Sequence, residues 1–288
     1  MKEDCFSAAL SHNPAIGKID PYLVAQYAVL EGCAKTVSVG ATPLALTDCL
    51  CFGNPEKPEE MWQFSQSCLA IREVCDNMRF NETKNLPIVA GNVSFYNQSG
   101  DHSIPASPMI GCFGKIKKKK VLKNGFQSLS SNLFLLGETP TFLGGSIVSD
   151  VLGVNNTKIE ALDLKKYNNM LGCVLEASEK ALLQSCSYVG LGGLATTVTK
   201  MSFLNNIGCV VEGLDKDCLF SENLSFVVEV SEKNSEAFEK ILNNKNCSYK
   251  QIGKTIDSNK VAIENFIELD IIKAKKVWKS SLKERLQK

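Results

Sequence analysis

The sequence is poor in histidine and carries almost no net charge. Only His12 and His102 occur in 288 residues, and histidine is the commonest general acid and base near neutral pH. A self-contained enzyme that relies on histidine would have to use one of these two. Thirty-two Lys and Arg residues stand against 31 Asp and Glu residues, which leaves a formal net charge of +1. Because no overall field would steer the protein onto nucleic acid or an anionic membrane, we expect neither partner.

Long apolar runs and paired-cysteine spacings are also missing. No run approaches the roughly 18 apolar residues of a membrane span, and the N-terminus lacks the basic and apolar segments of a secretion signal. The twelve cysteines include no C-x-x-C pair, and many lie inside apolar runs, as free buried thiols usually do. We therefore expect a protein of the reducing cytoplasm.

What is present is the composition of a folded chain, 44% hydrophobic and 22% charged, with a length typical of about two domains. The sharpest compositional shift is the lysine-rich stretch 115–123, followed by Asn124-Gly125. It predicts a solvated strand end and a linker, since no aromatic residues are interleaved as in a nucleic-acid patch. We place the domain boundary here, giving domains 1–123 and 124–288.

Hydrophobic periodicity predicts helices and short strands in both domains. Pro21 suits the first turn of a helix that ends near Lys35, and Pro58 with two following acidic residues starts a second helix that reaches Met78. Short apolar runs bounded by Pro or Gly indicate strands. These are 44–46, 88–90 and 109–113 in the first domain and 133–136 and 226–230 in the second, which also has predicted helices at 236–242 and about 272–286. Both domains are thus predicted to be mixed α and β, in an α+β arrangement.

The strongest candidate site follows the apolar strand of segment 86–97. Gly91 allows close approach to the backbone, and Asn92 and Ser94 point to the same face of an extended segment. An amide oxygen and a hydroxyl can serve a hard cation and a substrate oxygen together. The alternative is a turn in which both side chains bond the backbone.

Asp48 is a second candidate, because it interrupts the apolar stretch 46–52. Burying a bare carboxylate is costly, so this one must be solvated, capped or paired. It could accept hydrogen bonds from a nucleotide, hold Mg²⁺, or simply cap a backbone turn.

The remaining motifs are weaker. The glycine-rich pieces 143–146 and 190–194 fit neither G-x-x-x-x-G-K-[ST] nor G-x-G-x-x-G, and each is more often a tight turn or a close contact. His12 and His102 are expected to be surface loop residues.

The segments Thr47-Asp-Cys-Leu-Cys-Phe-Gly-Asn-Pro-Glu-Lys-Pro-Glu59 and Gly91-Asn-Val-Ser-Phe-Tyr-Asn97 resemble the synthetase subunit of phosphoribosylformylglycinamidine synthase, within the aminoimidazole-ribotide-synthetase-like superfamily. The resemblance extends through Val39-Gly-Ala-Thr-Pro-Leu-Ala45 and, more loosely, through the second domain. It implies a two-domain unit in which the N-terminal sheet with its helices pairs with a second copy and the C-terminal domain is α/β. In that family the subunit contains two such halves, and this chain resembles the second.

The resemblance also implies an activity. It implies that ATP phosphorylates the amide oxygen of formylglycinamide ribonucleotide, and that ammonia from a glutaminase subunit then displaces phosphate. The implied cofactors are ATP and Mg²⁺. The implied partners are the ribonucleotide substrate, the missing N-terminal half or a second copy, the glutaminase subunit and a small bridging subunit.

Carried over by position, the family pattern makes Asp48 and Gly91 ATP contacts, Asn92 a Mg²⁺ ligand and Ser94 a substrate contact. No residue of this chain inherits a catalytic role, because the family's catalytic His belongs to the first half. We therefore expect a carbon-nitrogen ligase component that is inactive alone.

The second domain departs from the family pattern. Where the family usually has His-Asp-x-Ser-[Asp/Glu]-Gly-Gly-Leu, this chain reads Ser187-Tyr-Val-Gly-Leu-Gly-Gly-Leu194, and the Arg expected after 219–222 is replaced by Asn223-Leu-Ser-Phe226. A mainly structural role is expected there. The rival hypothesis is a non-catalytic homodimeric nucleotide-binding or scaffolding module, and a third is another superfamily enzyme such as a selenophosphate synthetase or thiamine-phosphate kinase.

Overall fold

The chain forms two compact units. The computed structural model describes residues 4–80, 85–154 and 158–286. Unit 1 consists of residues 1–121 and 142–176, and unit 2 consists of residues 122–141 and 177–288. The chain thus enters unit 2 next to the predicted boundary at 123/124, but residues 142–176, which that prediction placed in the second domain, belong to unit 1.

Hydrogen bonds to the first long helix explain why the later segment belongs to unit 1. The buried Gln26 side chain accepts a hydrogen bond from the Leu162 backbone N–H at 2.9 Å. The Tyr27 hydroxyl donates to the Glu160 carbonyl at 3.0 Å. Because both partners are main-chain groups, the sequence pattern gave no signal of this return.

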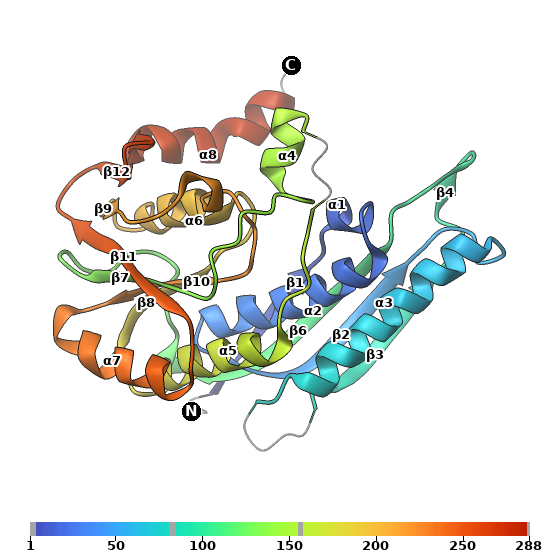
Figure 1. Cartoon of the computed structure of the whole chain (residues 1–288), viewed down its shortest axis with the longest axis horizontal. Helices are drawn as coiled ribbons and strands as arrows, with labels where there is room; N and C mark the ends of the chain where they lie inside the picture. The colour runs from blue at the N-terminus through green and yellow to red at the C-terminus, as the bar shows by residue number, and fades with distance from the viewer. Residues whose placement is uncertain (1–3, 81–84, 155–157, 287–288) are drawn as a thin grey trace. The chain divides into compact units, whose positions relative to one another are not determined.

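Unit 1 contains a four-stranded sheet covered by helices (Figure 1). The strand order is β1-β6-β2-β3, in which β2 and β3 are parallel and the other pairs are antiparallel. The strands are β1 (Asp4–Ser11), β2 (Thr42–Cys51), β3 (Ile88–Ser94) and β6 (Ser107–Lys117), with a small ladder of β4 (Gln98–Ser99) and β5 (His102–Ser103). The helices are α1 (Pro14–Gly17), α2 (Pro21–Ser38), α3 (Pro58–Asn77), the 3-10 turn η1 (Lys118–Lys120), α4 (Ile147–Leu152) and α5 (Leu164–Glu179).

Capping and burial fix the position of α2. The Asp20 carboxylate accepts hydrogen bonds from the backbone N–H groups of Tyr22 and Leu23, both at 2.8 Å, and so caps the helix start. The helix is buried along almost its whole length, where it packs against the sheet and against α3. It therefore serves as the core of unit 1.

The opposite face of this sheet carries exposed apolar side chains. Phe6 is 80% exposed and Leu10 77% exposed on β1, and Phe113 of β6 is also exposed. A β-carbon added at Gly111 would meet Leu10, Phe113 and Thr47, so these residues share one face. We call this the open face of unit 1. Its apolar side chains are of the kind that mark an association surface.

Unit 2 is a seven-stranded sheet between helices, in the order β13-β12-β9-β11-β7-β10-β8. Leu133 and Leu135 of β7 pack in a cluster with Val198 of α6, whereas the ring of Phe134 lies 5.4 Å from that of Phe238 in α7. Alternate residues of one strand thus serve helices on both faces. The strands are β7 (Asn132–Leu136), β8 (Leu183–Tyr188), β9 (Gly208–Val211), β10 (Phe226–Val230), β11 (Tyr249–Ile256), β12 (Lys260–Ile263) and β13 (Ile267–Asp270). The helices are α6 (Gly193–Ser202), the 3-10 turn η2 (Lys216–Cys218), α7 (Glu232–Asn244) and α8 (Ile271–Leu286).

The mixed α and β fold predicted from the sequence is confirmed. Strand β10 has the predicted bounds, and each of the other predicted helices and strands lies within or overlaps an observed element. The lysine-rich stretch ends β6 and forms η1, with exposed lysine side chains, as predicted. Among the described residues, each helix is too short or too polar to cross a lipid bilayer.

Candidate functional site

The four candidate residues lie on two neighbouring strands of unit 1. The parallel register of β2 and β3 places Asp48 beside Gly91, Cys49 beside Asn92 and Cys51 beside Ser94. Strand alternation puts these pairs on opposite faces of the sheet. Asp48 and Gly91 belong to the face that α3 covers, whereas Asn92 and Ser94 belong to the open face.

The Asp48 carboxylate occupies the space left by the missing side chain of Gly91. A β-carbon at Gly91 would lie 2.1 Å from Asp48 Oδ1. Partial burial raises the pKa of Asp48, and the hydrogen bond that the carboxylate accepts from the Asn92 backbone N–H opposes the rise. The carboxylate is therefore partly desolvated and accepts a hydrogen bond from the backbone. It caps the backbone, as one of the sequence alternatives expected, but it is also partly buried.

Asn92 lies among sulfur atoms on the open face. Its side-chain amide Nδ2 is 3.3 Å from the Cys49 Sγ, and the Cys49 Sγ is 3.8 Å from the Cys51 Sγ. Sequence reasoning singled out Asn92 but missed the two thiols. The i, i+2 spacing of Cys49 and Cys51 on one strand was the available signal.

Ser94 is held in a local network. The Asn97 side-chain amide donates to the Ser94 carbonyl at 2.8 Å, to the Ser94 hydroxyl at 3.1 Å and to the Phe52 carbonyl at 3.0 Å. This network fixes the turn that follows β3. The alternative expected from the sequence, a turn in which the Asn92 and Ser94 side chains bond the backbone, does not match these bonds: the Ser94 hydroxyl bonds the Asn97 side chain, and it is Asn97 that bonds the backbone.

The two histidines differ in their surroundings. His102 is exposed on β5, as expected for a surface residue. His12 is half-buried, and burial lowers its pKa, although a hydrogen bond to the Pro108 backbone and the charge of Glu31 oppose this effect. The expectation of a surface loop is thus wrong in part for His12, which follows β1 and is partly covered.

The glycine-rich loop of unit 2 is occupied by an internal carboxylate. The Gly192 backbone N–H donates to Glu222 Oε1 at 2.8 Å, at the start of α6. A helix start is where a phosphate would otherwise bind through backbone N–H groups. The Glu222 carboxylate already supplies a negative charge at this position.

The glycine pair at 144–145 serves close packing in unit 1. A β-carbon at Gly144 would lie 2.4 Å from the Lys158 carbonyl oxygen, and one at Gly145 would meet Ile16 of α1. The Asn13 side chain also donates to the Gly145 carbonyl at 3.3 Å. The loop of residues 142–146 therefore packs closely against α1.

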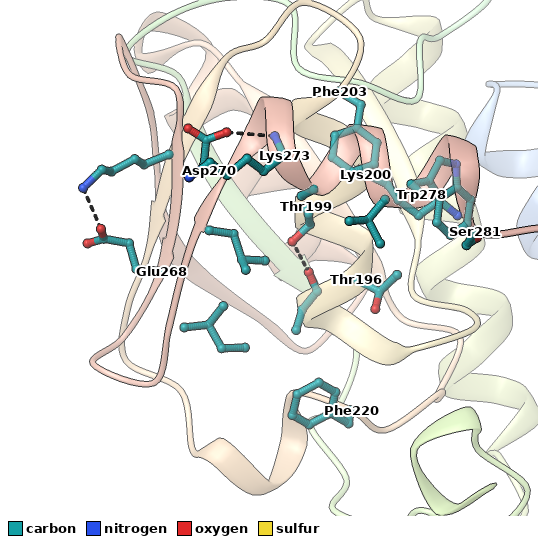
Figure 2. Close-up of a pocket in the computed structure, with 16 residues that line it drawn as sticks. Thr196, Thr199, Lys200, Phe203, Phe220, Glu268, Asp270, Lys273, Trp278 and Ser281 are labelled. Atoms are coloured by element: carbon teal, nitrogen blue, oxygen red, sulfur yellow. Dashed lines mark hydrogen bonds and ion pairs between the residues drawn. The ribbon is translucent and has the colours of Figure 1, made fainter. Parts of the chain in front are cut away.

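Unit 2 also has a groove of about 920 Å³ between α6, β13 and α8 (Figure 2). Its wall combines aromatic rings with lysines, and Lys200 Nζ lies 4.8 Å from the centroid of the Trp278 ring. Lys260 pairs with Glu268 at 2.6 Å. The groove is lined by Ala195, Thr196, Thr199, Lys200, Phe203, Phe220, Lys260, Ile267, Glu268, Leu269, Asp270, Lys273, Ala274, Val277, Trp278 and Ser281.

Two family models match the chain, one for each half. The N-terminal domain of AIR synthase related proteins matches residues 1–116, and the C-terminal domain of the same family matches residues 132–264. The chain therefore belongs to the AIR synthase related proteins, whose two domains follow one another here.

The similar curated proteins are named phosphoribosylformylglycinamidine synthase subunit PurL. The protein of Sulfurimonas denitrificans is 37% identical over 226 residues, which are 77% of this chain and 30% of that protein. The protein of Methanothrix thermoacetophila is 31% identical over 303 residues, covering 100% of this chain and 39% of its own length. The chain thus spans about a third of the length of these relatives.

Solved structures share the fold at low sequence identity. The Thermotoga maritima PurLQS structure aligns with a TM-score of 0.76 and 14% identity, covering 93% of this chain and 44% of the other. The Thermotoga maritima PurL complexed with FGAR gives 0.76 and 15%, covering 94% and 46%. A thiamine-monophosphate kinase from Stenotrophomonas maltophilia gives 0.65 and 13%, covering 91% and 86%. At these identities the likeness shows the shared fold alone.

Proposed function

We propose that this chain is the C-terminal half of an ATP-dependent carbon-nitrogen ligase that converts formylglycinamide ribonucleotide, ATP and ammonia to formylglycinamidine ribonucleotide. The ATP phosphorylates the amide oxygen, and ammonia displaces phosphate. The observation that carries the proposal is the parallel pairing of β2 with β3, which places Asp48, Gly91, Asn92 and Ser94 at neighbouring register positions. Purine biosynthesis in the cytoplasm is the setting that we propose.

Two of these residues are suited to binding ATP. Gly91 makes room for the Asp48 carboxylate against the β3 backbone, and this carboxylate can accept hydrogen bonds from ribose or base groups. The Ser94 hydroxyl, which bonds the Asn97 side chain, is the proposed substrate contact on the open face. The residues bind and orient, which is the main task of a protein in phosphoryl transfer.

The residues that the structure describes offer too few oxygen ligands in one place for a complete Mg²⁺ site. Mg²⁺ prefers six oxygen ligands, often from carboxylates and water. No cluster of three or more His, Cys, Asp or Glu side chains suited to a metal lies within 4–80, 85–154 and 158–286, and Asn92 offers one amide oxygen beside two thiols. We propose that Asn92 contributes a single ligand and that the carboxylates come from the missing half.

The open face is the surface proposed to meet that half. Phe6, Leu10 and Phe113 present apolar area on the same sheet that carries Asn92. Pairing this face would bury the apolar side chains and bring the other half beside Asn92 and Ser94, whereas Asp48 and Gly91 lie on the helix-covered face of the same two strands. A glutaminase subunit and a small bridging subunit are the further proposed partners. The glutaminase subunit supplies ammonia to the assembled site.

The test is a mixing experiment. The chain is combined with the missing half, ATP, Mg²⁺, ammonium and formylglycinamide ribonucleotide, and ADP release is followed, with each half alone as a control. We expect ADP release that depends on both halves and on the ribonucleotide. If the mixture releases no ADP in a ribonucleotide-dependent manner, the proposal is wrong.

A specific observation favours a second candidate function. Because Glu222 occupies the glycine-rich loop, unit 2 is already committed to an internal contact, as a structural module would be. A homodimer that pairs through the open face, and that binds nucleotide or acts as a scaffold without turnover, would fit this feature. A stable dimer of the chain that binds ATP and remains inactive with the other half would support it.

A further inference from the structure

Cys49 and Cys51 form a matched pair of thiols on the open face of unit 1. They are two residues apart on β2, so their side chains leave the same face of the sheet. Both are half-buried free thiols. Their sulfur atoms are 3.8 Å apart, in contact as donor and acceptor of a weak hydrogen bond.

This separation matches a metal site better than a disulfide. In a tetrahedral zinc site with Zn–S bonds of about 2.3 Å, two thiolate sulfurs lie about 3.8 Å apart. A disulfide would require the two sulfurs to approach to about 2.05 Å. The pair already has the bite of a bidentate thiolate ligand, so a metal ion can bind with little movement of β2.

The neighbouring groups are soft or neutral. The antiparallel register of β6 with β2 places Met109 directly opposite Cys49, on the same face of the sheet. Asn92 on the other side contributes a neutral amide 3.3 Å from the Cys49 Sγ. Thiolate and thioether sulfurs select thiophilic metals rather than Mg²⁺.

We propose that Cys49 and Cys51 form a two-thiolate binding site for a thiophilic d¹⁰ metal ion such as Zn²⁺, Cd²⁺ or Cu⁺, with Met109 beside it as a soft neighbour. Binding replaces the proton of each thiol by the metal, and the two protons pass to the solvent. Solvent molecules complete the coordination, because no third His, Cys, Asp or Glu joins the pair among the described residues. The site stands on this geometry and does not depend on the proposed function.

The experiment titrates the whole, reduced chain with Cd²⁺ and follows the ultraviolet charge-transfer absorption of cadmium thiolates, without oxygen and with a reductant that contains no thiol. We expect saturation at one ion per chain. Cys49→Ser and Cys51→Ser should each weaken binding by at least about tenfold, the scale that even outer-shell changes reach at metal sites. Cys68→Ser, which removes a half-buried thiol of α3, is the matched control and should bind as the unmodified chain does.

The double variant Cys49→Ser/Cys51→Ser measures the background from the other ten cysteines, and thermal unfolding checks that each variant folds. The two single variants are independent, so one remains informative if the other fails to fold. The proposal is overturned if the unmodified chain shows no thiolate absorption at one equivalent of Cd²⁺, or if the double variant keeps it. A loss of two mass units per chain on exposure to a disulfide oxidant, without cadmium binding, would also contradict it.

Discussion

The Asp48 carboxylate lies where the side chain of Gly91 would be, and a β-carbon on Gly91 would approach Asp48 Oδ1 to 2.1 Å. This contact across β2 and β3 links the acidic residue of one strand to the glycine of the next. It explains why the two family-like segments need each other: the glycine makes room, and the following Asn92 N–H bonds the carboxylate.

Gly91→Ala should turn the Asp48 side chain away from β3. The obstructing atoms belong to a side chain, so the carboxylate can rotate, but it then loses the Asn92 N–H bond, worth about 1 kcal/mol. We expect the free energy of unfolding in urea to fall by about this amount, and ATP binding by the assembled halves to be lost. Gly172→Ala is the control, because a β-carbon there meets nothing within 4 Å on α5. Equal effects of both changes would contradict the role of the contact.

Asp48→Asn should stabilise the fold increasingly as the pH rises through the acid range. Burial raises the pKa of Asp48 above 3.8, so between the two pKa values the folded state holds more protons than the unfolded state. The contribution of Asp48 to stability therefore falls as the pH rises, and Asn has no such titration. Thermal unfolding of both proteins from acid to neutral pH measures the difference. A difference that is flat or shrinks with pH would show that the carboxylate is not desolvated.

Glu229→Gln should destabilise unit 2 strongly. The fully buried Glu229 carboxylate accepts hydrogen bonds from the backbone N–H groups of Gln127 and Ser128, both at 2.8 Å, and from the Ser185 hydroxyl at 2.7 Å. A glutamine amide replaces one of the two acceptor oxygens by an NH₂ group, which then faces N–H or O–H donors. We expect this to lower the free energy of unfolding by about 2–4 kcal/mol. Urea unfolding checks this value. Glu236→Gln, which affects an exposed pair with Lys240, should change little, and the prediction is wrong if the two variants are equally stable.

Leu10→Glu should block association through the open face without unfolding the chain. Leu10 is 77% exposed, so a charge there costs the isolated chain little, but it would be buried in a paired face. Sedimentation of the chain with the other half, or alone at high concentration, measures the association. Val151→Glu, at an exposed position on α4, is the control and should associate normally. If Leu10→Glu associates as the unmodified chain does, the open face is not the interface.

The sequence predicted those parts of the fold that depend on local patterns. Pro21 and Pro58 marked helix starts correctly, because a proline at the first turn needs no partner. Strand β1 was not predicted. Its large apolar residues Phe6 and Leu10 lie on the exposed face and smaller residues lie on the covered face, which is the reverse of the usual pattern. The return of residues 142–176 to unit 1 depends on main-chain contacts of Leu162 and Glu160, which no side-chain pattern encodes.

For the candidate site, the sequence identified residues but not their faces. Asp48, Gly91, Asn92 and Ser94 were chosen from composition and family resemblance, and the register of β2 with β3 places them on adjacent positions. That Asp48 and Asn92 leave opposite faces follows only from this register. The soft surroundings of Asn92 were missed because Cys49 was treated as one thiol among twelve.

The central claim is that the paired strands β2 and β3 form one wall of a shared active site. Its most direct test uses this chain with Asn92→Ala. The measurement is the rate of ribonucleotide-dependent ADP release by the two mixed halves. Asn92 is exposed on β3, so the variant should fold and associate normally. We expect the rate to fall by at least about tenfold, the effect of losing one interaction of about 1.4 kcal/mol in the transition state. Asn234→Ala on α7 should leave the rate unchanged. A rate for Asn92→Ala equal to that of the unmodified mixture would contradict the claim.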